Sequence, residues 1–267
     1  MSRTYNAAIV GAGIGGLHMA GFLVRPELIR PLVVCDIDLQ RAEALAAKAA
    51  GAGITASFDE VLANPEIDIV DICLPPFLHR EFVLRALDAG KHVICEKPLV
   101  GSLREVDELE AAAKESGRVL MPVYQYRFGS GLGKLRHLIG EGLAGTAFVA
   151  TIETHWNRLA AYYDVPWRGK LESELGGAVL GHAIHAHDML MVALGPVRRV
   201  MALKAVRVNR IETEDCAAVL FEMQSGALVT SSVTLGSADE ISRFRFCFEE
   251  VTAQSGLAPY TPASDPW

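Results

Sequence analysis

A glycine-rich segment near the start of the chain has the spacing of a dinucleotide site. Gly11, Gly13 and Gly16 form the pattern G-x-G-x-x-G, directly after a short apolar run and before a stretch with helical character. In this pattern the first glycine permits a tight turn, the second lets the backbone approach a diphosphate, and the third lets the helix pack closely on the strand. The helix N-terminus then favours the anion. A glycine-rich turn without a ligand is the alternative interpretation.

Asp36 strengthens this interpretation and bears on the choice of cofactor. It ends the second apolar run, 20 residues after Gly16, where a carboxylate can hold the two ribose hydroxyls. A carboxylate here repels a 2′-phosphate, so NAD is favoured over NADP. Arg41 is near enough to complicate this preference, but on a helix it is interpreted as a solvated residue.

Lys97 is a second candidate for chemistry, in the sequence Glu96-Lys97-Pro98. A lysine rarely ends a buried strand, because removing an ammonium group from water is costly. At the carboxyl edge of a parallel sheet, where ligands bind, it could hold the oxygen of a reacting alcohol or carbonyl. The alternative is a surface lysine paired with Glu96.

The third candidate is the sequence HAIHAHD, which holds three of the eight histidines. On a helix His182, His185 and Asp188 share one face, and His187 points elsewhere. Three interpretations stay open from spacing alone. These are an acid/base histidine with a nearby carboxylate, a zinc site, and histidines with a purely structural role.

Alternating strands and helices must position the first two candidates. Short apolar runs predict strands at 7–10, 31–36, 67–74, 92–95 and 119–123. Helical patterns lie between them, at 17–24, 42–50, 59–63, 79–89 and 103–116. This alternation indicates right-handed βαβ units and a parallel sheet. The cysteines near strand ends, Cys35, Cys73 and Cys95, are then small core residues.

The second half has a different rhythm. Helices are expected at 133–141 and 177–194, a loop at 157–174, and strands suited to antiparallel pairing at 147–156, 199–208, 215–223, 227–235 and 241–249. The Ser225-Gly226 turn predicts a hairpin. Phe244, Phe246 and Phe248 alternate with polar residues, as in a half-buried strand. We place the boundary near 122–127, with a dinucleotide-binding domain at 1–123 and a substrate-binding and oligomerisation domain at 124–267.

Composition excludes several classes of protein. Of the 267 residues, 51% are apolar and 21% charged, which excludes disorder for most of the chain, and a net charge of −7 disfavours nucleic acid as a partner. The five cysteines form no CxxC pair, which argues against disulfides and structural zinc and for the cytoplasm. Residues 4–24 lack charged side chains and could mimic a membrane span or a signal peptide. Their glycines and His18 fit a strand–loop–helix better, so no membrane association is expected.

The motifs VGAGIGG, DIVDICLPPFLH, AGKHVICEKPL, YRF, GGAVL and HAHD occur in that order over nearly the whole chain. In this set the chain resembles the Gfo/Idh/MocA family, named for glucose–fructose oxidoreductase and inositol dehydrogenase. The resemblance implies an α/β fold, with an N-terminal Rossmann domain followed by an α+β domain with an open mixed sheet. It also implies oxidation or reduction of a hydroxyl carbon of a sugar, a cyclitol or a related polyol with NAD(P).

The resemblance also assigns residues. It makes Lys97 and His185 catalytic, and it implies no metal. It places at the cofactor Gly11, Gly13, Ile14, Gly16, Asp36, Leu74, Pro75, His79, Glu96, Lys97, Gln125, Trp167 and Arg168. It places at the substrate Lys97, Arg127, His182, His185 and Asp188.

Three departures from the family pattern stand out. Many members carry Asp where this chain has Gly181, so either His182 substitutes or the substrate differs. Gln125 stands where an Asn is common. Relatives also continue past the end of this chain, so we expect the second domain to be truncated.

These observations predict an NAD-dependent oxidoreductase that acts on a sugar-like small molecule. A dinucleotide-binding sensor without turnover is the alternative, and a zinc hydrolase built on HAIHAHD is a third class. A dimer or tetramer is expected through the open face of the second sheet, where Arg243 and Arg245 alternate with apolar residues.

Overall fold

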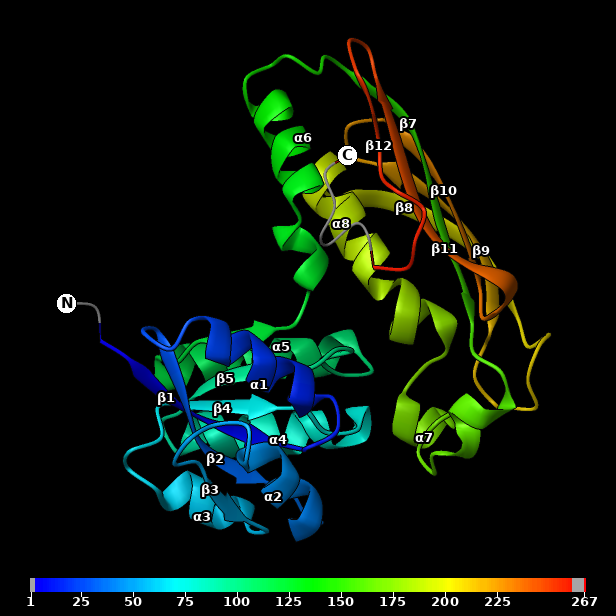
Figure 1. Ribbon diagram of the computed structural model, residues 1–267. Helices are drawn as coiled ribbons and strands as arrows, with labels where there is room; N and C mark the ends of the chain where they lie inside the picture. Colours follow the sequence, from blue (N-terminus) through cyan, green and yellow to red (C-terminus); the bar gives the residue numbers. More distant parts are fainter. Residues whose placement is uncertain (1–2, 261–266) are drawn as a thin grey trace. The chain divides into compact units, whose positions relative to one another are not determined.

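The computed structural model describes residues 3–260 and Trp267, and the chain separates into two compact units, Met1–Val123 and Tyr124–Trp267 (Figure 1). Each unit has its own sheet and its own apolar core. No helix in the described part of the chain is long and apolar enough to cross a membrane.

The first unit is built on a parallel sheet with the strand order β3-β2-β1-β4-β5-β6. Its strands are β1 (Tyr5–Val10), β2 (Ile29–Cys35), β3 (Gly53–Thr55), β4 (Ile69–Ile72), β5 (His92–Cys95) and β6 (Leu120–Pro122). Its helices are α1 (Gly15–Val24), α2 (Leu39–Ala46), α3 (Phe58–Ala63), α4 (Pro76–Asp88) and α5 (Leu103–Ser116). The strand order reverses between β1 and β4, which is where open α/β sheets bind their ligands.

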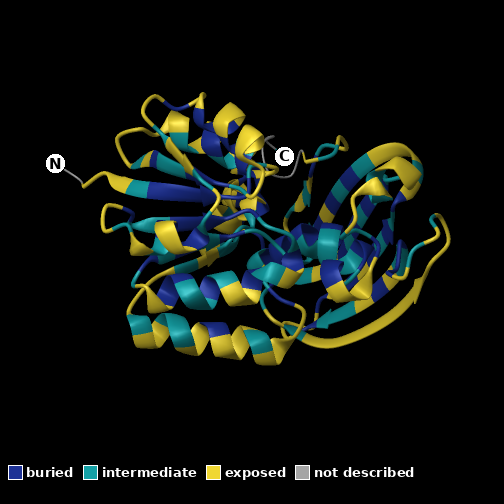
Figure 2. Cartoon of the chain, turned by 90° about the horizontal axis from the view of Figure 1, so that it is seen from below, coloured by how far each residue is buried: buried dark blue, intermediate teal, exposed yellow. Residues whose placement is uncertain are grey.

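Both faces of this sheet are covered, as the alternation along β1 shows. Ala8 and Val10 belong to one apolar cluster, which includes Val83 of α4 and Leu109 of α5. Ile9 between them belongs to another cluster, with residues of α1 and α2. The central strands are therefore buried on both sides and consist almost entirely of apolar residues (Figure 2).

Strand β3 was not predicted. It has the sequence Gly-Ile-Thr, pairs only with β2, and is largely exposed. A three-residue edge strand is too short to show a hydrophobic period, so its pairing depends on the neighbouring strand.

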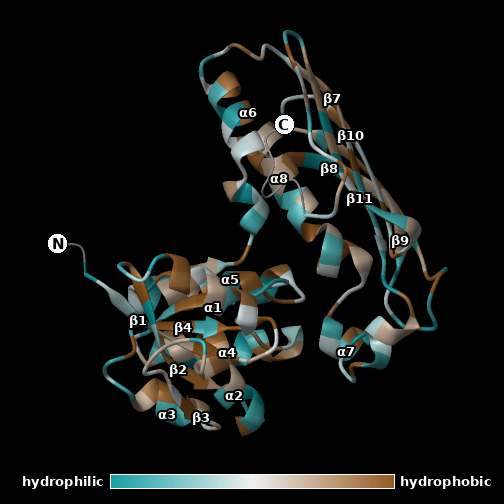
Figure 3. Ribbon diagram, in the orientation of Figure 1, coloured by the Kyte–Doolittle hydropathy of each residue, from teal (hydrophilic) through white to brown (hydrophobic). Residues whose placement is uncertain are grey.

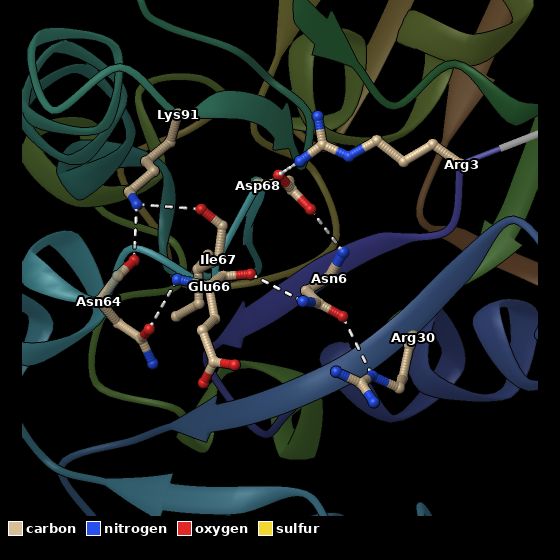
Figure 4. A network of polar contacts seen from close by, with 8 residues as sticks. All are labelled: Arg3, Asn6, Arg30, Asn64, Glu66, Ile67, Asp68 and Lys91. Carbon is tan, nitrogen blue, oxygen red and sulfur yellow. Dashed lines mark hydrogen bonds and ion pairs between the residues drawn. The ribbon is translucent and has the colours of Figure 1, made fainter.

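A network of hydrogen bonds and ion pairs connects the amino ends of strands in the first sheet (Figure 4). This edge of the sheet is opposite to the candidate site. The buried Lys91 ammonium donates to the carbonyl oxygens of Asn64 (2.7 Å) and Ile67 (2.9 Å). Asn6 donates from its backbone N–H to the Asp68 carboxylate at 2.9 Å. Burial lowers the pKa of Lys91, but two carbonyl partners offset the loss of water. This edge has a structural role in joining β1, β4 and β5.

The second unit contains a mixed sheet with the order β12-β11-β7-β10-β9-β8. Its strands are β7 (Ala147–Asn157), β8 (Val197–Ala205), β9 (Cys216–Met223), β10 (Leu228–Thr234), β11 (Gly236–Phe248) and β12 (Thr252–Gln254). Its helices are α6 (Ser130–Gly140), α7 (Leu171–Glu174) and α8 (Ile184–Leu194), with 3-10 turns at Gln125–Phe128 and Ala160–Asp164. The predicted fold class is confirmed, but antiparallel pairing does not hold throughout, because β10 lies parallel to β7. The expected loop at 157–174 also contains a 3-10 turn and α7.

One face of this sheet packs on helices and the other is open. Phe244 and Phe246 are fully buried in a core with Leu132 of α6 and Met189 of α8. The opposite face carries exposed apolar side chains such as Met201 and Leu220 together with charged ones such as Arg243. Along the strands the residues accordingly vary from hydrophobic to hydrophilic (Figure 3). This is the pattern predicted from the alternation of the three phenylalanines.

The helix expected at 177–194 is not a single α-helix. Val179–Ala183 is a π-helical turn that leads into α8. The Glu214 carboxylate accepts from the backbone N–H groups of Gly177 and Val179 at 3.2 Å, which holds the start of this segment. Turns of the π type are rare and occur often at functional sites.

Candidate active site

The glycine-rich turn joins β1 to α1 and can be formed only with glycine at its first position. Gly11 has φ = +102°, and a Cβ there would lie 2.4 Å from the carbonyl oxygen of Cys73. The turn is therefore pressed against the end of β4. Ile14, the N-cap residue of α1, is 44% exposed, and its apolar side chain cannot accept a hydrogen bond from the helix N-terminus. The first turn of α1 contains no acidic residue. The positive end of the helix dipole is thus available to an anion.

Close packing between helix and strand belongs to Gly15, not to Gly16 as the pattern predicted. A Cβ at Gly15 would lie 2.7 Å from Cγ2 of Ile9, whereas a Cβ at Gly16 or Gly13 would meet no protein atom within 4 Å. The two adjacent glycines shift the packing contact by one residue. Gly13 and Gly16 leave the backbone of the turn open to a ligand.

Asp36 is fixed beside this turn. One carboxylate oxygen accepts from the N–H of Ala12 at 2.7 Å, and the other accepts from the N–H of Asp38 at 2.9 Å. Each oxygen keeps a further lone pair that a ribose hydroxyl could use. The side chain of Arg41 is 70% exposed and lies 3.6 Å from the Asp38 carboxylate, in agreement with a solvated residue.

Glu96 and Lys97 follow the end of β5, at the same edge of the sheet. Glu96 Oε2 accepts from the backbone N–H of Lys97 at 3.0 Å, and Oε1 lies 3.1 Å from Nε2 of His18. The His18 ring also lies 2.9 Å from the buried carboxylate of Asp71. Burial acts to raise the pKa of Glu96, but His18 and Lys97 outweigh it and the pKa is lowered, so Glu96 is a carboxylate.

His79 lies beneath the loops at this edge. It is fully buried, with Nδ1 2.8 Å from the carbonyl oxygen of Pro98 and Nε2 2.8 Å from that of Leu74. Burial lowers the pKa of His79, although these backbone contacts oppose the shift. The ring therefore joins the loop after β4, where Pro75 caps α4, to the loop after Lys97. A bound cofactor would contact these loops, and the buried His79 ring would support them from below.

The second unit places His185 in an aromatic setting. His185 is 3% exposed and stacks on Tyr126 with ring centroids 5.1 Å apart, while Tyr124 contacts it edge-on at 6.4 Å. Tyr126 and its neighbour Arg127 belong to the 3-10 turn that packs on α8. Arg127 donates to both carboxylate oxygens of Asp188, at 2.7 and 2.5 Å. His185 and Asp188 thus face the same turn, and Gln125 begins it at an exposed position.

His182 faces a different group, the aromatic segment between β7 and α7. Its Nε2 lies 3.2 Å from the Tyr162 hydroxyl, and its ring meets Trp156 edge-on. Arg168 donates to the same hydroxyl and lies over the rings of Tyr162 and Trp167, at 3.9 and 4.3 Å from their centroids. Such stacking fixes the guanidinium plane. His182 and His185 are therefore held by separate neighbours.

His187 points away from His185, as helical spacing predicted, and the structure shows that it contacts the sheet. Its Nε2 lies 3.0 Å from the Ser231 hydroxyl and its ring contacts Phe221, and burial lowers the pKa of His187 to about 4. Among the described residues, the HAIHAHD side chains do not form a group with the spacing of metal ligands. The zinc-hydrolase interpretation thus loses its geometric basis.

Two family models match most of the chain. Residues 5–124 match "Oxidoreductase family, NAD-binding Rossmann fold", and residues 132–254 match "GFO/IDH/MocA C-terminal domain". The chain belongs to the Gfo/Idh/MocA oxidoreductase family. The resemblance predicted from the motifs is thereby confirmed.

Relatives in this family include sugar dehydrogenases. The chain is 32% identical over 199 residues to D-glucoside 3-dehydrogenase of Escherichia coli (strain K12), covering 73% of this chain and 55% of that protein. It is 29% identical over 211 residues to levoglucosan dehydrogenase of Pseudarthrobacter phenanthrenivorans, covering 75% and 54%. The chain thus spans about half the length of these curated relatives. The crystal structure of the WlbA dehydrogenase from Bordetella pertussis in complex with NADH and UDP-GlcNAcA superposes with a TM-score of 0.91 at 28% identity, covering 97% of this chain and 75% of that one.

Sequence reasoning missed the partners that surround the candidate residues. Asp71 and Tyr162 were not singled out, and His18 was noted only for its place in an apolar segment. One signal was present: Asp71 is the only carboxylate between Ile69 and Leu74, and a charged residue inside a buried strand requires a partner. The identity of that partner depends on the fold.

Proposed function

We propose that this Gfo/Idh/MocA protein is an NAD-dependent oxidoreductase that transfers a hydride between nicotinamide and a hydroxyl carbon of a sugar, a cyclitol or a related polyol. The observation that carries the proposal is the carboxyl edge of the first sheet. At this edge the glycine-rich turn follows β1, Asp36 follows β2, and Glu96 and Lys97 follow β5. The glycine-rich turn is hydrogen-bonded to Asp36 through the N–H of Ala12. The dehydrogenase names of the relatives support the same class of substrate.

In the proposed mechanism, one residue of this chain accepts a proton and another stabilises a negative charge. His185 removes the hydroxyl proton while the hydride leaves the same carbon, and Lys97 stabilises the charge that develops on the oxygen. The bound nicotinamide supplies the hydride acceptor. We assign the cofactor to Gly11, Gly13, Gly16, Asp36 and the loops around Leu74 and Glu96, with Arg168 as a further contact. Arg127, His182 and Asp188 are proposed substrate residues, and His182 takes the place of the acidic side chain that Gly181 lacks.

The test is turnover with a panel of sugars, sugar acids and cyclitols, with single-turnover formation of NADH as the readout. A panel member that yields NADH supports the proposal. Tight NADH binding without any turnover would instead support the alternative, a dinucleotide-binding sensor. The absence of both would overturn the dinucleotide site itself.

Replacing Asp36 with Ala should weaken NADH binding and narrow the preference for NADH over NADPH by about tenfold, or ~1.4 kcal/mol. The carboxylate both accepts ribose hydroxyls and repels the 2′-phosphate, so both effects come from one side chain. Fluorescence titration with each nucleotide measures the ratio. The matched control is Asp38→Ala, which removes a neighbouring carboxylate that caps α2. A preference that Asp36→Ala leaves unchanged would refute the role of this residue.

We also propose that the open face of the second sheet forms a homo-oligomer interface. Met201 and Leu203 of β8, 70% and 79% exposed, lie beside Leu220 and Leu228 on that face. A sheet face that exposes several large apolar side chains is typical of an interaction surface. Leu203→Glu should therefore convert a dimer or tetramer to a monomer at micromolar concentration in light scattering. Leu143→Glu, at an exposed leucine outside the sheet, should leave the assembly intact, and a wild-type monomer would contradict the proposal.

The cytoplasm is the proposed location. All five cysteines are unpaired thiols, and burial raises the pKa of Cys35 to about 11 and that of Cys73 to about 12. Buried thiols of this kind are unreactive core residues and suit a reducing compartment.

A further inference from the structure

Three ionisable side chains from three elements of the first unit meet beneath the Lys97 turn. His18 comes from α1, Asp71 from β4 and Glu96 from the turn after β5. Nδ1 of His18 lies 2.9 and 3.0 Å from the two carboxylate oxygens of Asp71, and Nε2 lies 3.1 Å from Oε1 of Glu96. The side chains are 11%, 0% and 13% exposed, so water contributes little to their solvation.

A charged ring satisfies these distances with both carboxyl groups ionised, although burial acts to raise the pKa of Asp71. A neutral imidazole has one N–H and could donate to only one of the two carboxylates, whereas an imidazolium donates to both. A buried carboxylate is also costly unless a cation pairs with it. Burial acts to lower the pKa of His18, but its hydrogen bonds to Asp71, Cys73 and Glu96 raise the pKa to about 12. The Cys73 thiol, 3.5 Å from Nδ1, stays neutral because burial raises its pKa as well.

The ring connects two parts of the candidate cofactor site. His18 lies in the first turns of α1, directly after the glycine-rich turn that would bind the diphosphate. Glu96 uses its other oxygen to accept from the Lys97 N–H. A chain of hydrogen bonds therefore runs from α1 through His18 and Glu96 to the backbone of Lys97.

We propose that His18 is a positioning residue, which through its contacts with Asp71 and Glu96 holds the Glu96-Lys97 turn against β4 and α1 and so orients the Lys97 side chain. The inference depends on the proposed function in one respect, the catalytic role of Lys97. It assigns no contact between His18 and substrate. His18 acts through Glu96.

The spacing of His18, Asp71 and Cys73 could also suit a metal ion, which is the competing explanation. A metal would need the Cys73 sulfur as a thiolate and would take the lone pair of one ring nitrogen. The N···O separations of 2.9 to 3.1 Å are those of hydrogen bonds. We therefore assign the cluster to proton-mediated contacts.

The first experiment measures the charge on His18 and does not depend on turnover. In full-length protein labelled with ¹⁵N-histidine, both ring nitrogens of His18 should carry the imidazolium signature up to about pH 9, far above the ordinary histidine pKa of about 6.5. The His18→Gln variant assigns the signal. A neutral His18 at pH 8, or stoichiometric zinc in protein purified without chelators, would overturn the inference whatever the enzyme's substrate.

The second experiment separates positioning from structural support. His18→Gln leaves two buried carboxylates without their cation and should destabilise the protein, whereas His18→Gln combined with Asp71→Asn removes one of those charges and should recover stability. If His18 positions Lys97, the double variant should still have a kcat lowered by about 10²-fold, the size expected from a misplacement of about an ångström, with NADH affinity nearly unchanged. Recovery of kcat together with stability would show a structural role only.

A further readout covers the case in which no substrate is found. The rate at which an amine-acylating reagent modifies Lys97, measured by peptide mass spectrometry, should change several-fold in the double variant and not in His137→Gln. The rate at the exposed Lys48 serves as the internal reference. An unchanged Lys97 rate would refute the positioning role while leaving the dinucleotide site intact.

Discussion

Replacing His185 or Lys97 with Ala should each lower kcat by at least ~10²-fold, the usual loss when an acid/base or charge-stabilising group is removed. NADH affinity should change little, because the proposed diphosphate and ribose contacts lie at the glycine-rich turn and Asp36. The kcat of the double variant should fall far less than the product of the two single fold-losses. Two residues that act together on the same hydroxyl group have non-additive effects on the activation free energy. Steady-state and single-turnover kinetics with the substrate from the panel measure all three values.

Two controls separate chemistry from packing at His185. His185→Phe keeps a ring that can stack on Tyr126, so it should lose kcat while retaining thermal stability. His187→Ala removes a buried ring and its contact with Ser231, so it should reduce stability more than kcat. The assignment is falsified if His187 proves essential for turnover while His185 is dispensable.

Replacing Gly11 with Ala should abolish tight NADH binding and destabilise the first unit by about 3 kcal/mol. The backbone at Gly11 has φ = +102°, and the new Cβ would lie 2.4 Å from the carbonyl oxygen of Cys73, which belongs to the backbone after β4 and cannot move alone. Urea denaturation and NADH fluorescence titration measure the two effects. The turn would have to open to relieve the contact, and the start of α1 would move with it.

Gly21→Ala is the matched control, in the same helix. A Cβ there meets no atom within 4 Å, and the residue is exposed within α1. This change should stabilise the protein by up to about 1 kcal/mol through helix propensity and leave NADH binding unaltered. Equal effects of the two substitutions would show that the glycine-rich turn tolerates a side chain, against the proposed geometry.

Local patterns were enough to predict the α/β class, the parallel strands β1, β2, β4 and β5, and the position of the candidate residues that follow them. These strands are short, mainly apolar runs. β1 is followed by Gly11, β2 by Asp36 and β5 by Glu96, and the run that contains β4 ends before Pro75. Asp36 and Lys97 could be placed at the carboxyl edge because parallel strands end at a common edge. The side-chain direction of His187 could likewise be predicted, because helical spacing alone determines it.

Other features depend on which segments lie side by side in space, and no local pattern contains that information. The edge strand β3 and the parallel pairing of β7 with β10 depend on a partner strand distant in sequence. The packing contact at Gly15 instead of Gly16 depends on where Ile9 lies against α1. The ion pair of Arg127 with Asp188 joins residues 61 positions apart.

The sequence by itself determined most of the helices and strands of this protein and the sheet edge at which Asp36 and Lys97 lie. Hydrophobic period, glycine spacing and helix face are properties of neighbouring residues, so they can be recognised in one dimension. Only the tertiary structure decided that His18, Asp71 and Glu96 meet, because they come from three elements that are brought together by burial of the sheet. A charged residue within an apolar run indicates from the sequence that a partner is needed. Which residue becomes the partner depends on desolvation and on distances in the folded chain, and these are set by the tertiary structure.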